Sequence, residues 1–136
     1  MAPVLKSIDH VHVFVSDRKT SENWYRETLG FERTTELEFW APNGGPLTVQ
    51  NKDGSIHLAL FERSPEKCRS TIALGSDASA FLLWKKHLQQ HLLAGVEAVD
   101  HEVSWSLYFN DPDGNPFEIT TYEYQEVKRG LARGEA

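Results

Sequence analysis

A chain of 136 residues is long enough to bury the core of one domain, or of two small halves that share a core. Its 14 Lys and Arg against 20 Asp and Glu give a formal net charge of −6, which argues against a nucleic-acid-binding or anionic-membrane surface. Neither a secretion signal nor an apolar run of the roughly 20 residues that a bilayer requires is recognisable, so we expect a cytoplasmic protein without a membrane partner. The single cysteine, Cys68, excludes an intrachain disulfide and receives no role.

The first half of the sequence predicts the order β-α-β-β-β. Residues 7–15 alternate between valines and other side chains, as in a strand. Residues 21–29 are predicted as a helix, with Asp17 and Ser21 as caps and Gly30 as the residue that ends it. Three strands are then expected, at residues 31–40, 46–50 and 55–61.

The second half repeats that order after a polar connector at residues 63–69. A polar tail at residues 125–136 is expected to be ordered only in part. Internal similarity at this scale indicates two copies of one supersecondary unit that bury a shared core. The expected elements are a strand at 70–75, a helix at 78–94 with Gly95 behind it, and strands at 97–99, 105–110 and 116–122.

One carboxylate stands out in the last predicted strand. The turn sequence Asp-Pro-Asp-Gly at residues 111–114 predicts that Tyr108 and Glu118 lie on adjacent antiparallel strands. Alternation places Glu118 on the face opposite Phe117 and Ile119. A glutamate in such a strand is either solvated or a ligand.

Histidines fall on corresponding faces of the first half. The valines of the first strand are expected to cover a helix, which leaves His10 and His12 on the other face, and alternation leaves His57 on that face of its own strand. After the two Asp-Gly turns, His57 and Glu118 occupy nearly corresponding places. Each residue alone is more often a satisfied histidine or a solvated glutamate, but together His10, His57 and Glu118 predict one divalent metal ion, either Fe(II), Mn, Zn or Ni. His12 is assigned to the pocket wall.

The helix predicted at 78–94 carries His87 and His91 at i, i+4 spacing, which would suit a zinc pair. Its apolar stripe of Trp84, Leu88 and Leu92 is expected to pack inward and to leave the polar positions in water. No metal role is therefore predicted for this pair.

In this order the residues resemble the vicinal oxygen chelate superfamily, which includes glyoxalase I, bleomycin-resistance proteins, extradiol dioxygenases and fosfomycin-resistance transferases. The resemblance implies an α+β fold in which two βαβββ modules, at about 5–62 and 70–124, form a cupped mixed sheet with helices outside. It implies a single domain over residues 1–136, one divalent metal ion and a homodimer. The residues that carry it are Asp9-His10-Val11-His12-Val13, Val15-Ser16-Asp17, Ser21, Trp24-Tyr25, Leu29-Gly30-Phe31, Tyr108-Phe109, Asp111-Pro112-Asp113-Gly114-Asn115 and Phe117-Glu118.

The resemblance also assigns roles to single residues. His10 and Glu118 match the histidine of the family's first strand and the glutamate of its last strand, and His57 fills a further ligand position. Thr71 stands where dioxygenases and fosfomycin-resistance enzymes have histidine, and a site emptied by that change would make the protein a metal-free binder.

Three residues are assigned to proton transfer and catalysis. Tyr108 is similarly placed to the active-site tyrosine of extradiol dioxygenases. His101 is similar to their acid or base histidine, and His101 or His12 would move protons. The residues expected to line the substrate pocket are Thr71, Ser106, Trp105 and Trp40.

We therefore expect a metal-dependent enzyme acting on a small oxygenated substrate, with ring-cleaving dioxygenation slightly preferred. Glyoxalase-like isomerisation is disfavoured because Thr71 supplies no acidic fourth ligand. A transferase is weaker still, because no Lys or Arg is recognised on the cavity side. The competing class is a small-molecule-binding protein that resembles bleomycin-resistance proteins and performs no chemistry.

Overall fold

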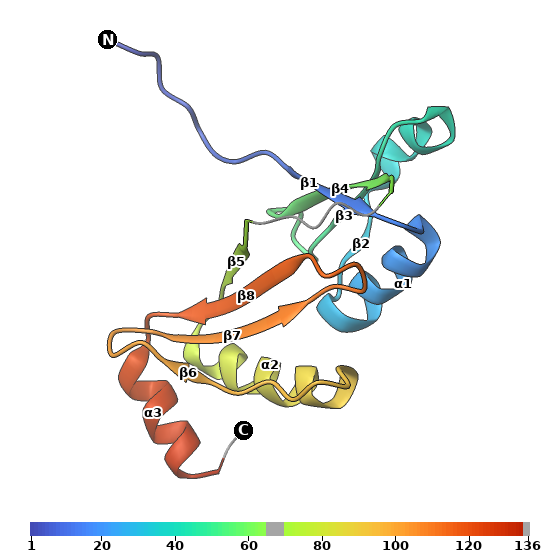
Figure 1. Cartoon of the computed structure of the whole chain (residues 1–136). Coiled ribbons are helices and arrows are strands. Elements are labelled where there is room, and N and C mark those ends of the chain that lie inside the picture. The colour runs from blue at the N-terminus through green and yellow to red at the C-terminus, as the bar shows by residue number, and fades with distance from the viewer. Residues whose placement is uncertain (65–69, 135–136) are drawn as a thin grey trace. The chain divides into compact units, whose positions relative to one another are not determined.

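The computed structural model describes residues 1–64 and 70–134, which belong to two compact units, Met1–Lys67 and Cys68–Ala136 (Figure 1). Each unit contains one four-stranded mixed sheet, in the order β1-β4-β3-β2 and β5-β8-β7-β6. The two orders are identical when the strands are counted from the start of each unit. The predicted α+β class with two βαβββ modules is thus confirmed, while the single domain over 1–136 stays a prediction.

In the first unit, β1 pairs in parallel with β4, and β4 and β2 both pair antiparallel with β3. Helix α1 begins after Asp17, whose side chain accepts a hydrogen bond from the Thr20 amide at 2.8 Å, and it ends at Gly30 with φ 73°. The elements are β1 (Val11–Val15), α1 (Arg18–Leu29), β2 (Glu32–Arg33), the 3₁₀ segment η1 (Thr35–Asn43), β3 (Leu47–Gln50) and β4 (His57–Glu62).

The second unit has the same pairing, with β5 parallel to β8 and β7 antiparallel to β8 and β6. The predicted turn before β8 is present: Gly114 has φ 83°, and the Asp111 carboxylate accepts hydrogen bonds from the amides of Asp113 and Asn115. The elements are β5 (Ile72–Gly75), α2 (Ala78–His91), β6 (Val99–Asp100), β7 (Trp105–Asn110), β8 (Pro116–Thr121) and α3 (Tyr124–Ala132).

One face of each sheet is buried against helices, as the two-residue alternation predicted. The opposite faces carry the polar residues of the predicted site. The buried residues on the helix side are Val13, Val15, Leu58 and Leu60 with Tyr25 and Leu29 of α1, and Leu107, Phe117 and Ile119 with Phe81 and Leu88 of α2.

The prediction of a strand over residues 31–40 is wrong from Thr35 onward, where the chain forms η1. The last pairing bond joins the Thr34 amide to the Thr48 carbonyl at 2.9 Å. Beyond this bond the neighbouring segment of the same chain is Pro46, which has no N–H to donate. The strand pairing therefore cannot continue.

Segment η1 is held close to the sheet by backbone contacts at its end. The Gly45 amide donates to the Trp40 carbonyl at 2.9 Å, and a Cβ atom at Gly45 would lie only 2.8 Å from that oxygen. The Arg18 guanidinium of α1 donates to the carbonyls of Gly45 at 2.7 Å and Ala41 at 3.1 Å. Glycine is therefore required at this close approach.

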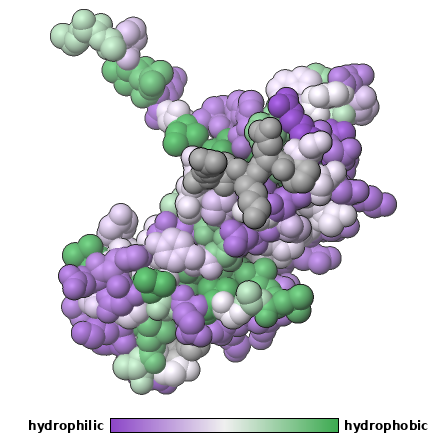
Figure 2. All heavy atoms as spheres, viewed as in Figure 1, coloured by the Kyte–Doolittle hydropathy of each residue, from purple (hydrophilic) through white to green (hydrophobic). Residues whose placement is uncertain are grey.

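The strand predicted at 7–15 begins only at Val11, because its partner β4 begins at His57. Residues 1–10 form an exposed arm without regular structure, on which Figure 2 shows hydrophobic side chains in the open. Val4 is 91% exposed and Leu5 92% exposed. Most of the predicted connector 63–69, including Cys68, lies outside the described residues.

Helix α3 covers most of the predicted tail at residues 125–136, for which no helix was predicted. Val127 of this helix is completely buried, and the rings of Tyr124 and Trp105 stack with centroids 5.5 Å apart. The apolar positions of α3 were hidden among charged residues in the sequence, so the amphipathic pattern was missed. Across residues 1–64 and 70–134, no helix combines the length and apolar character that crossing a membrane requires.

Replacing Glu22 by Gln is expected to lower the free energy of unfolding by about 0.5–1 kcal/mol at neutral pH. The Arg33 guanidinium of β2 donates two hydrogen bonds to the Glu22 carboxylate of α1, at 2.7 and 2.8 Å. These bonds hold the pKa of Glu22 below its ordinary value. The stabilisation is therefore complete above the unfolded-state pKa of about 4.3 and is lost as pH falls through the lower folded-state pKa.

Urea unfolding of the wild type and Glu22→Gln as a function of pH measures this effect. Glu27→Gln, an exposed position on the same helix, is the matched control and should change little at any pH. A stability difference that persists unchanged after the carboxylate is protonated would contradict the assignment.

Candidate metal centre

The face of the first sheet away from α1 carries three imidazoles. His12 lies beside Ala59 in the parallel β1–β4 pair, and alternation brings His57 to the same face. His10, just before β1, and His57 line one cavity of about 170 Å³. The predicted pocket residue Trp40 lines the same cavity, which is completed by Asp9, Leu37, Pro46, Thr48 and Ala59.

The His10 ring is oriented by two neighbours. Its Nδ1 lies 2.7 Å from Oδ2 of Asp9, and its Nε2 lies 3.1 Å from Nε2 of His12. An ionised carboxylate only accepts hydrogen bonds, so Nδ1 carries the proton and Nε2 keeps its lone pair. This is the tautomer in which a carboxylate-supported histidine binds a metal ion.

A cation on this face was missed by the sequence analysis. The Arg63 guanidinium lies 4.9 Å from the ring centroid of Phe14 and 5.4 Å from that of Phe61. The backbone amide of Arg63 donates to the Val15 carbonyl at 2.9 Å, which extends the β1–β4 pairing by one residue. The two-residue alternation from His57 through Phe61, if continued past the predicted strand end, would have found it.

In the second unit, Glu118 projects from β8 between Ala73 of β5 and Tyr108 of β7. The hydroxyl of Ser106 donates to Oε1 of Glu118 at 2.6 Å. Among the described residues, no group donates to the second carboxylate oxygen, Oε2. The carboxylate is thus oriented on one side and open on the other.

The predicted proton-transfer residues of the second unit are brought together. Nε2 of His101 lies 3.0 Å from the Tyr108 hydroxyl, and Tyr108 pairs across the strands with Glu118. Thr71 precedes β5 and is exposed, and alternation with Ala73 puts it on the Glu118 face. With Ser106, four predicted site residues thus share one face with Glu118.

Trp105 lies on the opposite face and corrects the prediction that it lines the pocket. Its side chain is only 9% exposed, and its Nε1 donates to the Tyr124 carbonyl at 3.2 Å. Alternation within β7 groups Trp105 with the buried Leu107 and apart from Ser106. Its role is to pack α3 onto the second unit.

Strand pairing defines which positions of the two units correspond. The second residue of the first strand pairs with the third residue of the last strand in both units: His12 with Ala59, and Ala73 with Glu118. Glu118 therefore corresponds to Ala59. His57 comes two residues earlier on the same face. The turn sequences predicted that His57 and Glu118 nearly correspond, but the strand pairing shows that Ala59, and not His57, corresponds to Glu118.

Among residues 1–64 and 70–134, no group of three or more His, Cys, Asp or Glu side chains is arranged to hold a metal ion. The predicted set of His10, His57 and Glu118 takes members from both units, and its convergence stays a prediction.

On α2, the rings of His87 and His91 lie 4.1 Å apart, and Nδ1 of His91 donates to the His87 carbonyl at 2.9 Å.

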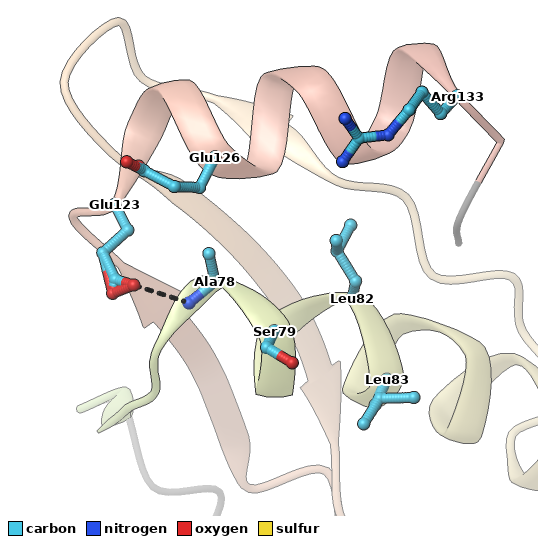
Figure 3. Close-up of a pocket in the computed structure, with 7 residues that line it drawn as sticks. All are labelled: Ala78, Ser79, Leu82, Leu83, Glu123, Glu126 and Arg133. Carbon is cyan, nitrogen blue, oxygen red and sulfur yellow. Dashed lines mark hydrogen bonds between the residues drawn. The ribbon is translucent and has the colours of Figure 1, made fainter.

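A larger cavity of about 480 Å³ lies between α2 and α3 (Figure 3). Leu82 of α2 points toward Arg133, the residue after α3 (Figure 3), and Leu83 and Glu126 also contribute to the lining. It lies on the helix side of the second unit, away from Glu118, and its lining has no imidazole or thiol. It is therefore a poor candidate for the metal site.

Comparison with known proteins identifies relatives of the chain. The family model described as the Glyoxalase/Bleomycin resistance protein/Dioxygenase superfamily matches residues 7–119. Virulence protein STM3117 of Salmonella typhimurium is 29% identical over 130 residues, covering 88% of this chain and 86% of the relative. Metallothiol transferase FosB of Staphylococcus epidermidis is 28% identical over 120 residues, covering 87% of this chain and 85% of the relative.

A solved structure extends these similarities to three dimensions. The fosfomycin resistance protein FosX from Listeria monocytogenes, complexed with Mn(II) and a sulfate ion, superposes with a TM-score of 0.64. The match covers 94% of this chain and 99% of that chain at 14% identity. At that identity it shows a shared fold.

Replacing Ser106 by Ala is expected to weaken divalent-metal binding by about tenfold, because the hydroxyl that orients Glu118 is lost. Isothermal titration of the protein with Mn²⁺ measures the dissociation constant. Ser79→Ala, an exposed serine on α2, is the matched control and should bind as the wild type does. Unchanged affinity in Ser106→Ala, with the fold intact by circular dichroism, would show that this hydrogen bond does not serve a ligand.

Proposed function

Because this chain belongs to the glyoxalase/bleomycin resistance protein/dioxygenase superfamily, we propose that it is a divalent-metal-dependent enzyme acting on a small oxygenated molecule. The observation that carries the proposal is that two side chains able to bind a metal ion are each oriented by a hydrogen-bonding neighbour. His10 is held by Asp9 and Glu118 by Ser106, each on the helix-free face of its own sheet. Such outer-shell partners are characteristic of metal ligands.

The donor set fits a divalent ion. Neutral imidazole and carboxylate suit Fe(II), Mn, Zn and Ni, and the FosX structure, which shares this fold, is complexed with Mn(II). His10 and Glu118 would hold the ion together with a third ligand from the first unit, for which His57 is the sequence prediction. A bound ion would polarise a substrate oxygen as a Lewis acid. A homodimer and a cytoplasmic location belong to the same proposal.

Ring-cleaving dioxygenation is the finer form of the proposal. In that reaction a catechol ring bond beside a hydroxyl is broken, and both atoms of dioxygen enter the product. The hydrogen-bonded pair of His101 and Tyr108 supports it, because a phenol and an imidazole 3.0 Å apart can pass a proton to or from a substrate oxygen. Tyr108 pairs with Glu118 across the strands, so the couple lies next to the proposed ligand.

A second candidate is addition of a thiol to a metal-bound, anionic substrate. Arg63 favours it, because its guanidinium, over the Phe14 ring, supplies a cation on the sheet face that carries the imidazoles. The FosB relative is named a metallothiol transferase. Glyoxalase-like isomerisation is less well supported, because the positions that correspond to Glu118 and His10 in the opposite units are Ala59 and Thr71, neither of which can act as a base.

The wild type purified without chelator is expected to contain about one divalent ion per chain. His10→Ala and Glu118→Ala should lose it, because each removes a proposed ligand. Elemental analysis of the dialysed proteins measures the stoichiometry. His91→Ala and Glu97→Ala, exposed residues of the same types outside the site, are the matched controls and should retain the ion.

Two results would contradict the proposal. A metal-free wild type that also binds no added Fe²⁺, Mn²⁺, Zn²⁺ or Ni²⁺ would favour the small-molecule-binding protein instead. Full metal content in both His10→Ala and Glu118→Ala would place the ion elsewhere.

The Fe(II)-loaded protein is expected to consume dioxygen and 4-methylcatechol in equal amounts, as an oxygen electrode and the rise of the ring-cleaved product would show. Tyr108→Phe should slow the reaction by about 10²-fold, because it removes a proton donor without removing a ligand. No oxygen uptake, combined with loss of cysteine thiol in the presence of Mn²⁺ and fosfomycin, would favour thiol addition. In that case Arg63→Ala should raise the KM for the anionic substrate.

A further inference from the structure

We infer that His12, and not His57, is the third protein ligand, so that strand β1 supplies two imidazoles to one ion through the sequence His10-Val11-His12. This inference rests on the proposed function, and it changes the role of His12 from pocket wall to ligand. Two imidazole nitrogens of the first unit must lie close enough together to coordinate one ion.

The distance between the two imidazoles fits shared coordination. Zinc–nitrogen bonds are about 2.0–2.1 Å long, so two nitrogens on one ion lie about 3.0 Å apart at right angles and about 3.4 Å apart at the tetrahedral angle. Nε2 of His10 and Nε2 of His12 are 3.1 Å apart. The separation of the two nitrogens is therefore in the range expected for two ligands of one ion.

Both rings are already held in place. They stack on each other with centroids 5.1 Å apart and an interplanar angle of 23°. On its far side the His10 ring is hydrogen-bonded to the exposed Asp9, and the His12 ring packs on Phe61 at 4.7 Å. Pre-orientation of this kind lowers the entropic cost of binding a metal ion.

His57 is less well placed for this role. It lies two residues before Ala59, the position that corresponds to Glu118, and so is displaced from the matching point of the duplicated sheet by about 7 Å. His57 remains a wall residue of the cavity.

The same comparison explains why a second imidazole from β1 is needed. The position in the second unit that corresponds to His10 is Thr71, which supplies neither imidazole nor carboxylate. The second unit thus contributes Glu118 from β8 but no side chain of ligand type from the start of β5. The imidazole of His12, in the first unit, provides the nitrogen ligand that Thr71 cannot provide.

Titration with Co²⁺ tests the inference, because the visible absorbance of the bound ion reports its ligands as well as its affinity. His12→Ala is expected to weaken Co²⁺ binding by more than the roughly 10- to 100-fold that loss of an outer-shell partner costs, and to change the spectrum. His57→Ala should change the dissociation constant less than about threefold and leave the spectrum unaltered. His12 is exposed, so its replacement should not unfold the protein, which a thermal melt would confirm.

The outcomes separate this inference from the proposed function. If His57→Ala loses the ion and His12→Ala keeps it, or if both lose it equally, the exclusive role of His12 is wrong while the metal-dependent function stands. If Co²⁺ binds equally to His12→Ala, His57→Ala, His10→Ala and Glu118→Ala, both proposals fail, and the 3.1 Å contact is only a hydrogen bond between two imidazoles.

Discussion

The parallel pairing of the first strand with the last strand of each unit is the constraint on which the rest of the structure depends. In the first unit this pairing sets His12 beside Ala59, and in the second it sets Ala73 beside Glu118. Because side chains alternate between faces, a shift of one residue in either pair would turn the polar side chains of the shifted strand into the helix-covered core. The burial of apolar residues against α1 and α2 therefore also determines which polar groups can meet a ligand.

Much of this fold could be predicted from the sequence, because its strands alternate clearly and its turns have diagnostic residues. The Asp17 cap, the Gly30 stop and the Asp111–Gly114 turn were all recognised and are present. The two errors have different causes. The strand expected at 31–40 has no partner beyond Pro46 and so does not extend past Thr34, whereas the amphipathic pattern of α3 was present in the sequence and was overlooked among its charged residues.

The sequence predicted which sheet face each residue of the candidate site occupies, but not the distances between these residues. Alternation correctly grouped His10 with His57, and Ser106 with Glu118, because it needs only the strand period. It could not show that Asp9 orients His10 or that two Nε2 atoms lie 3.1 Å apart, since those contacts depend on rotamers. Arg63 was missed for a different reason: the strand was assumed to end before it.

The cavity of the first unit is built from two structurally separate parts. Its imidazoles stand on or beside hydrogen-bonded strands, whereas Leu37 and Trp40 come from η1, which is held through backbone carbonyls by Arg18 and Gly45 and through Glu38 by Arg33. The side chains of Leu37 and Trp40 take no part in these bonds and can vary without altering them. The walls of the cavity can therefore change in shape while the imidazoles stay where the sheet holds them.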